Sequence, residues 1–147
     1  MNKSQVYIYD NLYSVLIERG LLKTGALISG YEVTLNGVPS KDPQMRCFDI
    51  AYLTKAQIQR GRNGEDVIPA FVVEIISEND VSYKIEAKLT EYFKAGVQVV
   101  WNIIPDEQVV HVYTSRKTVK ICTETDICSA APVLPEFEVS VAEIFAA

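Results

Sequence analysis

The chain has 147 residues, a hydrophobic fraction of 48%, a charged fraction of 22% and a formal net charge of −5. These values predict one globular domain over residues 1–147, and they exclude a disordered or coiled-coil chain. An acidic balance argues against a protein whose whole surface binds phosphate backbones, but it leaves room for a local basic stripe. Candidates for that stripe, each also explained as an ordinary solvated charge, are Lys55, Arg60, Arg62, Lys84, Lys88 and Lys94.

The cysteines and the N-terminal residues indicate the cellular compartment in which the protein is expected. Cys47, Cys122 and Cys128 have no metal-type spacing, and Asp10 interrupts the first apolar stretch, so that stretch does not read as a secretory signal. We therefore expect reduced thiols and a cytoplasmic protein. No apolar run approaches the ~20 residues of a membrane span. Because His111 is the single histidine, a zinc site or histidine-based triad would depend on it alone.

The first half of the chain predicts a helix followed by strands. Apolar residues at helical spacing indicate a helix over residues 5–19, with Gly20 as its stop. Residues 26–35 have strand composition interrupted by Gly30, and residues 37–46 read as a polar loop. A short strand is expected at 48–53, and residues 54–65 end in a turn-rich tip.

The second half predicts a β-strand, a helix and further strands. An apolar strand at 70–77 is followed by a helix that Asp80 or Ser82 caps and Gly96 ends. We expect a strand at 99–104, a hairpin from 109–114 and 119–123, and a terminal strand with a final helical turn. This order indicates an α/β fold with a mixed sheet, in which residues 70–104 form a right-handed βαβ unit.

Glu74 stands out inside the apolar strand FVVEII at residues 71–76. An ionised carboxylate is costly to bury without a partner. On the following helix, Val81, Ile85, Leu89, Tyr92 and Phe93 share the face that packs on the sheet, and Lys88 lies just outside this arc. Lys88 can therefore reach back toward Glu74 across the edge of the core.

Strand parity places a second carboxylate, that of Asp49, near Glu74. If strand 48–53 pairs beside strand 70–77, Asp49 and Glu74 can lie on the same face of adjacent strands. Two close carboxylates repel unless a proton or a divalent cation lies between them, and such hard oxygen ligands favour Mg²⁺ or Mn²⁺. The residues alone leave another interpretation open, in which Asp49 makes a local turn contact and Glu74 forms a partly buried ion pair with Lys88.

An ordered series of short motifs resembles the Uma2 family, a bacterial group with the PD-(D/E)XK restriction-enzyme-like fold. The motifs are FDIAYL, VVEIIS, EAK, EYFKAGV, VVWNIIPD and HVY, and they extend from Arg46 to Ser115. The tail LPEFEVSVAEIF matches more loosely. The resemblance implies a restriction-endonuclease-like core, with a mixed sheet flanked by helices.

The resemblance also implies a metal-dependent endonuclease that cleaves DNA. Asp49 and Glu74 would bind Mg²⁺ or Mn²⁺, with the backbone carbonyl of Ile75 as a further ligand. Ile76 occupies the position of the usual lysine, so Lys88 on the helix would take that role, as is usual in this family. Enzymes of this fold often work as dimers, which makes a homodimer a further expectation.

Three departures from the family pattern support a second interpretation. Phe48 replaces the proline before the aspartate, and Lys84 stands where many members carry an aspartate. The usual N-terminal segment, with a glutamate-bearing strand and a histidine, has no counterpart in the chain, so the domain is expected to be shortened there. The alternative function is therefore a catalytically degenerate nuclease fold that serves as an interaction or scaffold domain.

Overall fold

A computed structural model describes residues 2–35 and 45–147. Most of the predicted polar loop, residues 37–44, lies outside the described residues. The described elements are α1 (Lys3–Glu18), the 3-10 turn η1 (Leu21–Lys23), β1 (Gly25–Thr34), β2 (Met45–Thr54), α2 (Lys55–Arg62), β3 (Phe71–Ile75), α3 (Ser82–Ala95), β4 (Val99–Ile104), β5 (Val109–Ser115), β6 (Thr118–Thr123), β7 (Ile127–Ala130), β8 (Leu134–Ser140) and α4 (Val141–Ile144).

A six-stranded sheet in the order β1-β2-β3-β4-β5-β6 forms the centre of the fold. Strands β3 and β4, which precede and follow α3 in the chain, form the one parallel pair among the described strands of this sheet. The other four neighbouring pairs are antiparallel. The predicted hairpin is confirmed as β5 and β6. The fold is therefore the mixed α/β sheet with flanking helices that the sequence predicts.

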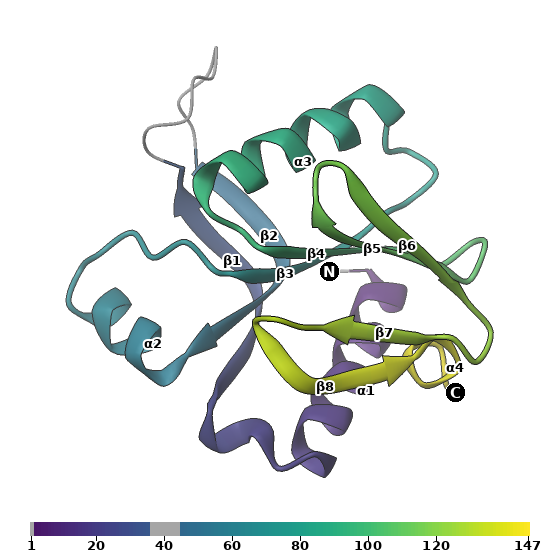
Figure 1. Ribbon diagram of the computed structural model, residues 1–147, viewed down its shortest axis with the longest axis horizontal. Coiled ribbons are helices and arrows are strands. Elements are labelled where there is room, and N and C mark those ends of the chain that lie inside the picture. Colours follow the sequence, from purple (N-terminus) through teal and green to yellow (C-terminus); the bar gives the residue numbers. More distant parts are fainter. Residues whose placement is uncertain (1, 36–44) are drawn as a thin grey trace.

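Two apolar cores lie on opposite faces of this sheet. Figure 1 shows α3 on one face, and α1, α4 and the two-stranded sheet β7-β8 on the other. The larger core, on the α1 side, contains Trp101, whose ring stacks on Phe137 at 5.7 Å and meets Phe71 at 5.0 Å. The smaller core packs Leu89 and Tyr92 of α3 against Val72 and Val100 of the sheet. No helix among the described residues is both long and apolar enough to cross a membrane.

Helix α3 confirms the predicted packing face in part. Leu89 and Tyr92 are buried, and Ile85 and Phe93 pack against the smaller core. The prediction is wrong for Val81, which is exposed because it stands at the N-cap position, outside the first turn. The predicted N-caps Asp80 and Ser82 are wrong as well, because Val81 holds that position, whereas Gly96 ends the helix as predicted. Asp80 accepts a hydrogen bond from the backbone of Ser77 at 2.7 Å and so closes the preceding turn instead.

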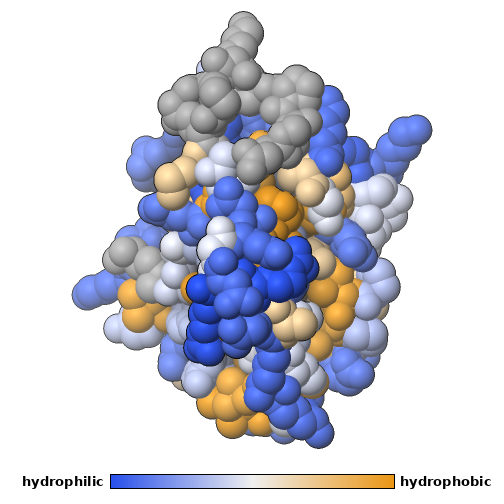
Figure 2. Space-filling view, turned by 90° about the vertical axis from the view of Figure 1, so that its left-hand side faces the viewer, coloured by the Kyte–Doolittle hydropathy of each residue, from blue (hydrophilic) through white to orange (hydrophobic). Residues whose placement is uncertain are grey.

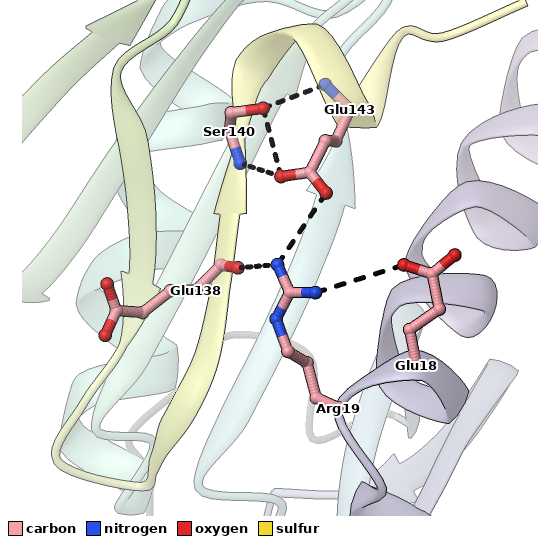
Figure 3. A network of polar contacts seen from close by, with 5 residues as sticks. All are labelled: Glu18, Arg19, Glu138, Ser140 and Glu143. Atoms are coloured by element: carbon pink, nitrogen blue, oxygen red, sulfur yellow. Dashed lines mark hydrogen bonds and ion pairs between the residues drawn. The ribbon is translucent and has the colours of Figure 1, made fainter.

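Arg19, which directly follows α1, contacts both β8 and α4. Figure 3 shows its guanidinium between the Glu138 carbonyl, at 3.5 Å, and the carboxylate of Glu143, at 3.7 Å. Ser140 caps α4 and exchanges hydrogen bonds with Glu143. These contacts hold β8 and α4 over the larger core.

Three elements have no counterpart in the sequence prediction, and the shortest of them is the 3-10 turn η1. Helix α2 forms where a turn-rich tip is expected, because Thr54 and Gln57 make a reciprocal capping box at its start. It buries none of its residues, and hydrophilic residues gather at the middle of the face on its side, with apolar patches around them (Figure 2). Strand β7 is short and pairs only with β8, so its four residues give a weak pattern.

Candidate active site

Asp49 and Glu74 lie at the point where the pairing of β2 with β3 ends. The last described pair of this ladder is Ile50 with Val73, so Asp49 and Glu74 are the next opposed positions. Their side chains replace the ladder with crossed hydrogen bonds. The Asp49 amide donates to Oε2 of Glu74 at 2.9 Å, and the Ile75 amide donates to Oδ2 of Asp49 at 2.8 Å. The expected adjacency of the two carboxylates is therefore present in the fold.

A change of face in β2 frees the Asp49 amide for this contact. Phe48 and Ile50 have the same strand parity, yet Phe48 packs in the α3-side core and Ile50 in the larger core. Opposite Asp49 on β1, Gly30 has a φ of +64°, a conformation that glycine adopts without strain. The β1–β2 ladder has no pair at this position. The predicted interruption at Gly30 is thus a local turn of the strand pair beside the site.

Glu74 is nearly fully buried, with 7% of its surface exposed. Burial, together with the charge of Asp49, raises its pKa to about 7 from the usual 4.5, against the opposing effect of its hydrogen bonds. Burial also raises the pKa of Asp49. A pair of carboxylates in this condition holds a proton near neutral pH, or accepts a cation in its place.

Tyr92 is a partner of Glu74 that the sequence pattern assigned only to packing. Its hydroxyl donates to Oε1 of Glu74 at 2.5 Å inside the smaller core. Burial and the neighbouring Glu74 charge raise the pKa of Tyr92, so it stays protonated and remains a donor. Tyr92 lies one helical turn after Lys88, and its contact with Glu74 spans 18 positions of the chain, so local spacing carried no signal for it.

Lys88 lines the same cavity but does not form the expected ion pair. Among the described residues it makes no hydrogen bond or ion pair within 4.0 Å. Its positive charge nevertheless lowers the pKa of both Asp49 and Glu74, against the effect of burial. The interpretation of Glu74 and Lys88 as a simple structural ion pair is therefore wrong, because Tyr92 and the Asp49 amide are the partners of Glu74.

A cavity of about 590 Å³ opens beside these residues, between α3, the carboxyl ends of β3 and β4, and the start of α1. Its described lining contains five acidic side chains and two basic ones, so an anionic substrate would meet an excess of negative charge unless cations accompany it. Of the predicted basic stripe, Lys84 and Lys88 lie here. The charged lining residues are Asp49, Glu74, Glu78, Asp80, Asp106, Lys84 and Lys88.

The donor set fits a hard divalent cation. Asp49 and Glu74 offer four carboxylate oxygens, of which three accept one hydrogen bond each here, and such an oxygen can accept more than one. Within residues 2–35 and 45–147, no group of three or more His, Cys, Asp or Glu side chains gathers around one metal position. Mg²⁺ is commonly held by one or two carboxylates with waters and substrate phosphates, so two carboxylates suffice.

A comparison with models of protein families matches residues 11–142 to Uma2, a family described as putative restriction endonuclease. This match covers most of the chain and includes Asp49, Glu74 and Lys88. A search of curated protein sequences gave no match.

Two solved structures resemble the fold. A protein from Anabaena variabilis ATCC 29413, described as a putative nuclease belonging to DUF820, superposes with a TM-score of 0.76 at 22% identity, over 99% of this chain and 82% of its own. The type IIG restriction endonuclease BpuSI superposes with a TM-score of 0.52 at 13% identity, over 95% of this chain and 15% of its own. At these identities the likeness shows that the fold is shared.

Proposed function

We propose that this chain, which belongs to the Uma2 family of restriction-endonuclease-like proteins, is a metal-dependent endonuclease that hydrolyses phosphodiester bonds in DNA. The observation that carries the proposal is the pairing of Asp49 and Glu74 at one end of the β2–β3 ladder, inside a cavity that Lys88 also lines. The excess of acidic groups in this cavity supports a requirement for cations before any phosphate enters.

Asp49 and Glu74 would hold Mg²⁺ or Mn²⁺, with the carbonyl of Ile75 as a further ligand. The ion would supply Lewis-acid stabilisation of the charge that develops on the phosphate. Lys88 makes no hydrogen bond or ion pair with the described residues, so its ammonium is available to orient the attacking water and to neutralise that charge. Tyr92 would hold the Glu74 carboxylate in place throughout.

Calorimetric titration with Mn²⁺ tests the proposal. We expect the wild-type protein to bind the ion, and Glu74→Gln and Asp49→Asn each to abolish binding at millimolar metal. Glu107→Gln is a matched control, because Glu107 is exposed and lies outside the described cavity lining. A nuclease assay on plasmid and linear DNA would follow, with Lys88→Ala expected to lose cleavage.

Absence of metal binding in the wild-type protein would overturn the catalytic proposal. The alternative, a degenerate nuclease fold that acts as an interaction domain, would then be favoured. Metal binding without cleavage of DNA would overturn the assigned reaction while leaving the two-carboxylate site intact.

A further inference from the structure

Asn102 on β4 is a buried polar residue that the chemistry above does not use. Glu74 and Asn102 are the two buried polar or charged residues among those described, with Asn102 at 4% exposure. They are register partners on the parallel strands β3 and β4, so their side chains lie next to each other on the same face. Both line the cavity.

The side-chain amide of Asn102 has no hydrogen-bond partner in the described part of the chain. Both nearby oxygens of Glu74 are engaged by Tyr92 and by the Asp49 amide, and Asn102 adds no bond to them. None of the described side-chain nitrogen or oxygen atoms is both fully buried and unpaired, so the polar atoms of Asn102 must open onto the cavity. A polar group in this position keeps its hydrogen-bonding capacity for water or for a ligand that enters the cavity.

The chemistry of the cavity indicates which molecule that is. Five carboxylates and two ammonium groups lie in the described lining, so the charged groups of the cavity are mostly acceptors. The amide NH₂ group of Asn102 supplies two donors without adding a charge to the buried Glu74 beside it. Neutral donors next to a metal-binding carboxylate suit the oxygens of a phosphate group held by the same ion.

We propose that Asn102 is a substrate-binding residue, whose side-chain amide donates a hydrogen bond to a non-bridging oxygen of the phosphodiester that enters the cavity beside Asp49 and Glu74. This inference rests on the proposed function for the identity of the ligand. It adds a residue that positions the scissile phosphate from β4, on the side of Glu74 opposite to Asp49.

Asn102→Leu tests the inference, because leucine has a similar shape and no hydrogen-bonding group. We expect affinity for a fluorescein-labelled DNA duplex, measured by anisotropy with Ca²⁺, to fall about 10-fold, as for loss of one bond to a charged group. Mn²⁺ affinity should stay within about 2-fold, and thermal stability should hold or rise because the folded protein loses no internal hydrogen bond. Asn102→Asp should weaken duplex binding further and strengthen Mn²⁺ binding, since it adds a carboxylate.

Asn63→Leu is the matched control. It removes the same amide from the exposed end of α2, outside the described cavity lining, and should leave duplex affinity unchanged. Unchanged duplex affinity in Asn102→Leu, or a thermal destabilisation of several degrees, would overturn the inference and make Asn102 a structural residue. Duplex binding without cleavage by the wild-type protein would overturn the proposed reaction only, whereas absence of duplex binding would overturn both.

Discussion

Tyr92 on α3 donates its phenolic hydrogen to Oε1 of Glu74 on β3 across 2.5 Å, and both side chains are buried. This bond joins the helix to the carboxylate that the sheet places at the cavity. Because a hydrogen bond to a carboxylate favours its ionised form, Tyr92 opposes the effect of burial on Glu74. The helix therefore controls how readily Glu74 gives up a proton for a cation.

Replacement of Tyr92 with phenylalanine should weaken metal binding through this bond. We expect Tyr92→Phe to raise the pKa of Glu74 further and to lower Mn²⁺ affinity about 10-fold near neutral pH, for a lost bond of roughly 1.5–3 kcal/mol. Calorimetry at neutral and higher pH checks this, because the deficit should shrink once Glu74 is fully ionised. Tyr113→Phe is the control, since Tyr113 packs at the same core without a bond to Glu74. Equal affinities at both pH values would contradict the assigned role.

The stability of the metal-free protein should depend on pH through Glu74. Its pKa is raised to about 7 in the folded state, against 4.5 for an ordinary glutamate, so the folded state holds this proton more tightly than the unfolded state does. The stabilisation is full below about pH 4.5 and is lost as pH rises through 7, a change of about 3 kcal/mol in the free energy of unfolding. Urea denaturation with chelator, across this range, should show that decline in the wild type and not in Glu74→Gln. Parallel pH profiles of the two proteins would refute the assignment.

Lys88 should affect metal binding and cleavage in opposite directions. Its charge lies close enough to lower the pKa of both carboxylates, so it also repels a cation between them. We expect Lys88→Ala to bind Mn²⁺ with the same or up to about 5-fold higher affinity, and to lose cleavage by 100-fold or more. Lys84→Ala, one turn earlier on α3, is the comparison variant for a general loss of positive charge. A weaker metal affinity in Lys88→Ala would argue against this placement.

Trp101 should dominate the stability of the larger core. It is fully buried, stacks on Phe137 and donates from Nε1 to the Ser129 carbonyl at 3.1 Å. We expect Trp101→Ala to lower the free energy of unfolding by about 3–5 kcal/mol, and Trp101→Phe by less. Chemical denaturation followed by circular dichroism measures both. A loss below about 1 kcal/mol for the alanine variant would contradict the described packing.

The three free thiols should differ in reactivity. Cys47 is exposed at the cavity, whereas Cys122 and Cys128 are fully buried, and burial raises the pKa of Cys128 well above its usual range. Ellman's reagent should therefore titrate one thiol per folded chain and three in denaturant. Substitution of Cys47 by serine should remove the fast-reacting thiol. Rapid reaction of three thiols in the native protein would contradict the burial of Cys122 and Cys128.

Strand and helix periodicity predict much of the site. The face of β2 that carries Asp49, the apolar strand around Glu74 and the position of Lys88 on α3 follow from local spacing, which tertiary packing preserves. The partners of Glu74 do not follow from it. Tyr92 falls in the apolar arc of its helix, and the pattern cannot distinguish an aromatic ring that only packs from one whose hydroxyl reaches a buried carboxylate.

Other features depend on contacts between distant segments. Asn102 reads as one polar residue in an apolar strand, and its importance arises from its register with Glu74, 28 positions earlier in the chain. The change of face at Gly30 and Asp49 requires both strands of the hairpin together. Helix α2 has only Ala56 and Ile58 as apolar residues and gives no apolar periodicity, so only its capping box at Thr54 indicates it.

The crossed hydrogen bonds at the end of the β2–β3 ladder make two backbone amides sensitive to the charge of the carboxylates. The amide of Ile75 donates to one carboxylate and the amide of Asp49 donates to the other. An amide proton shared with a charged acceptor forms a shorter and stronger bond than one shared with a neutral acceptor. The nuclear magnetic resonance signals of these two amides therefore report the ionisation of Asp49 and Glu74 separately, residue by residue, without any label on the side chains.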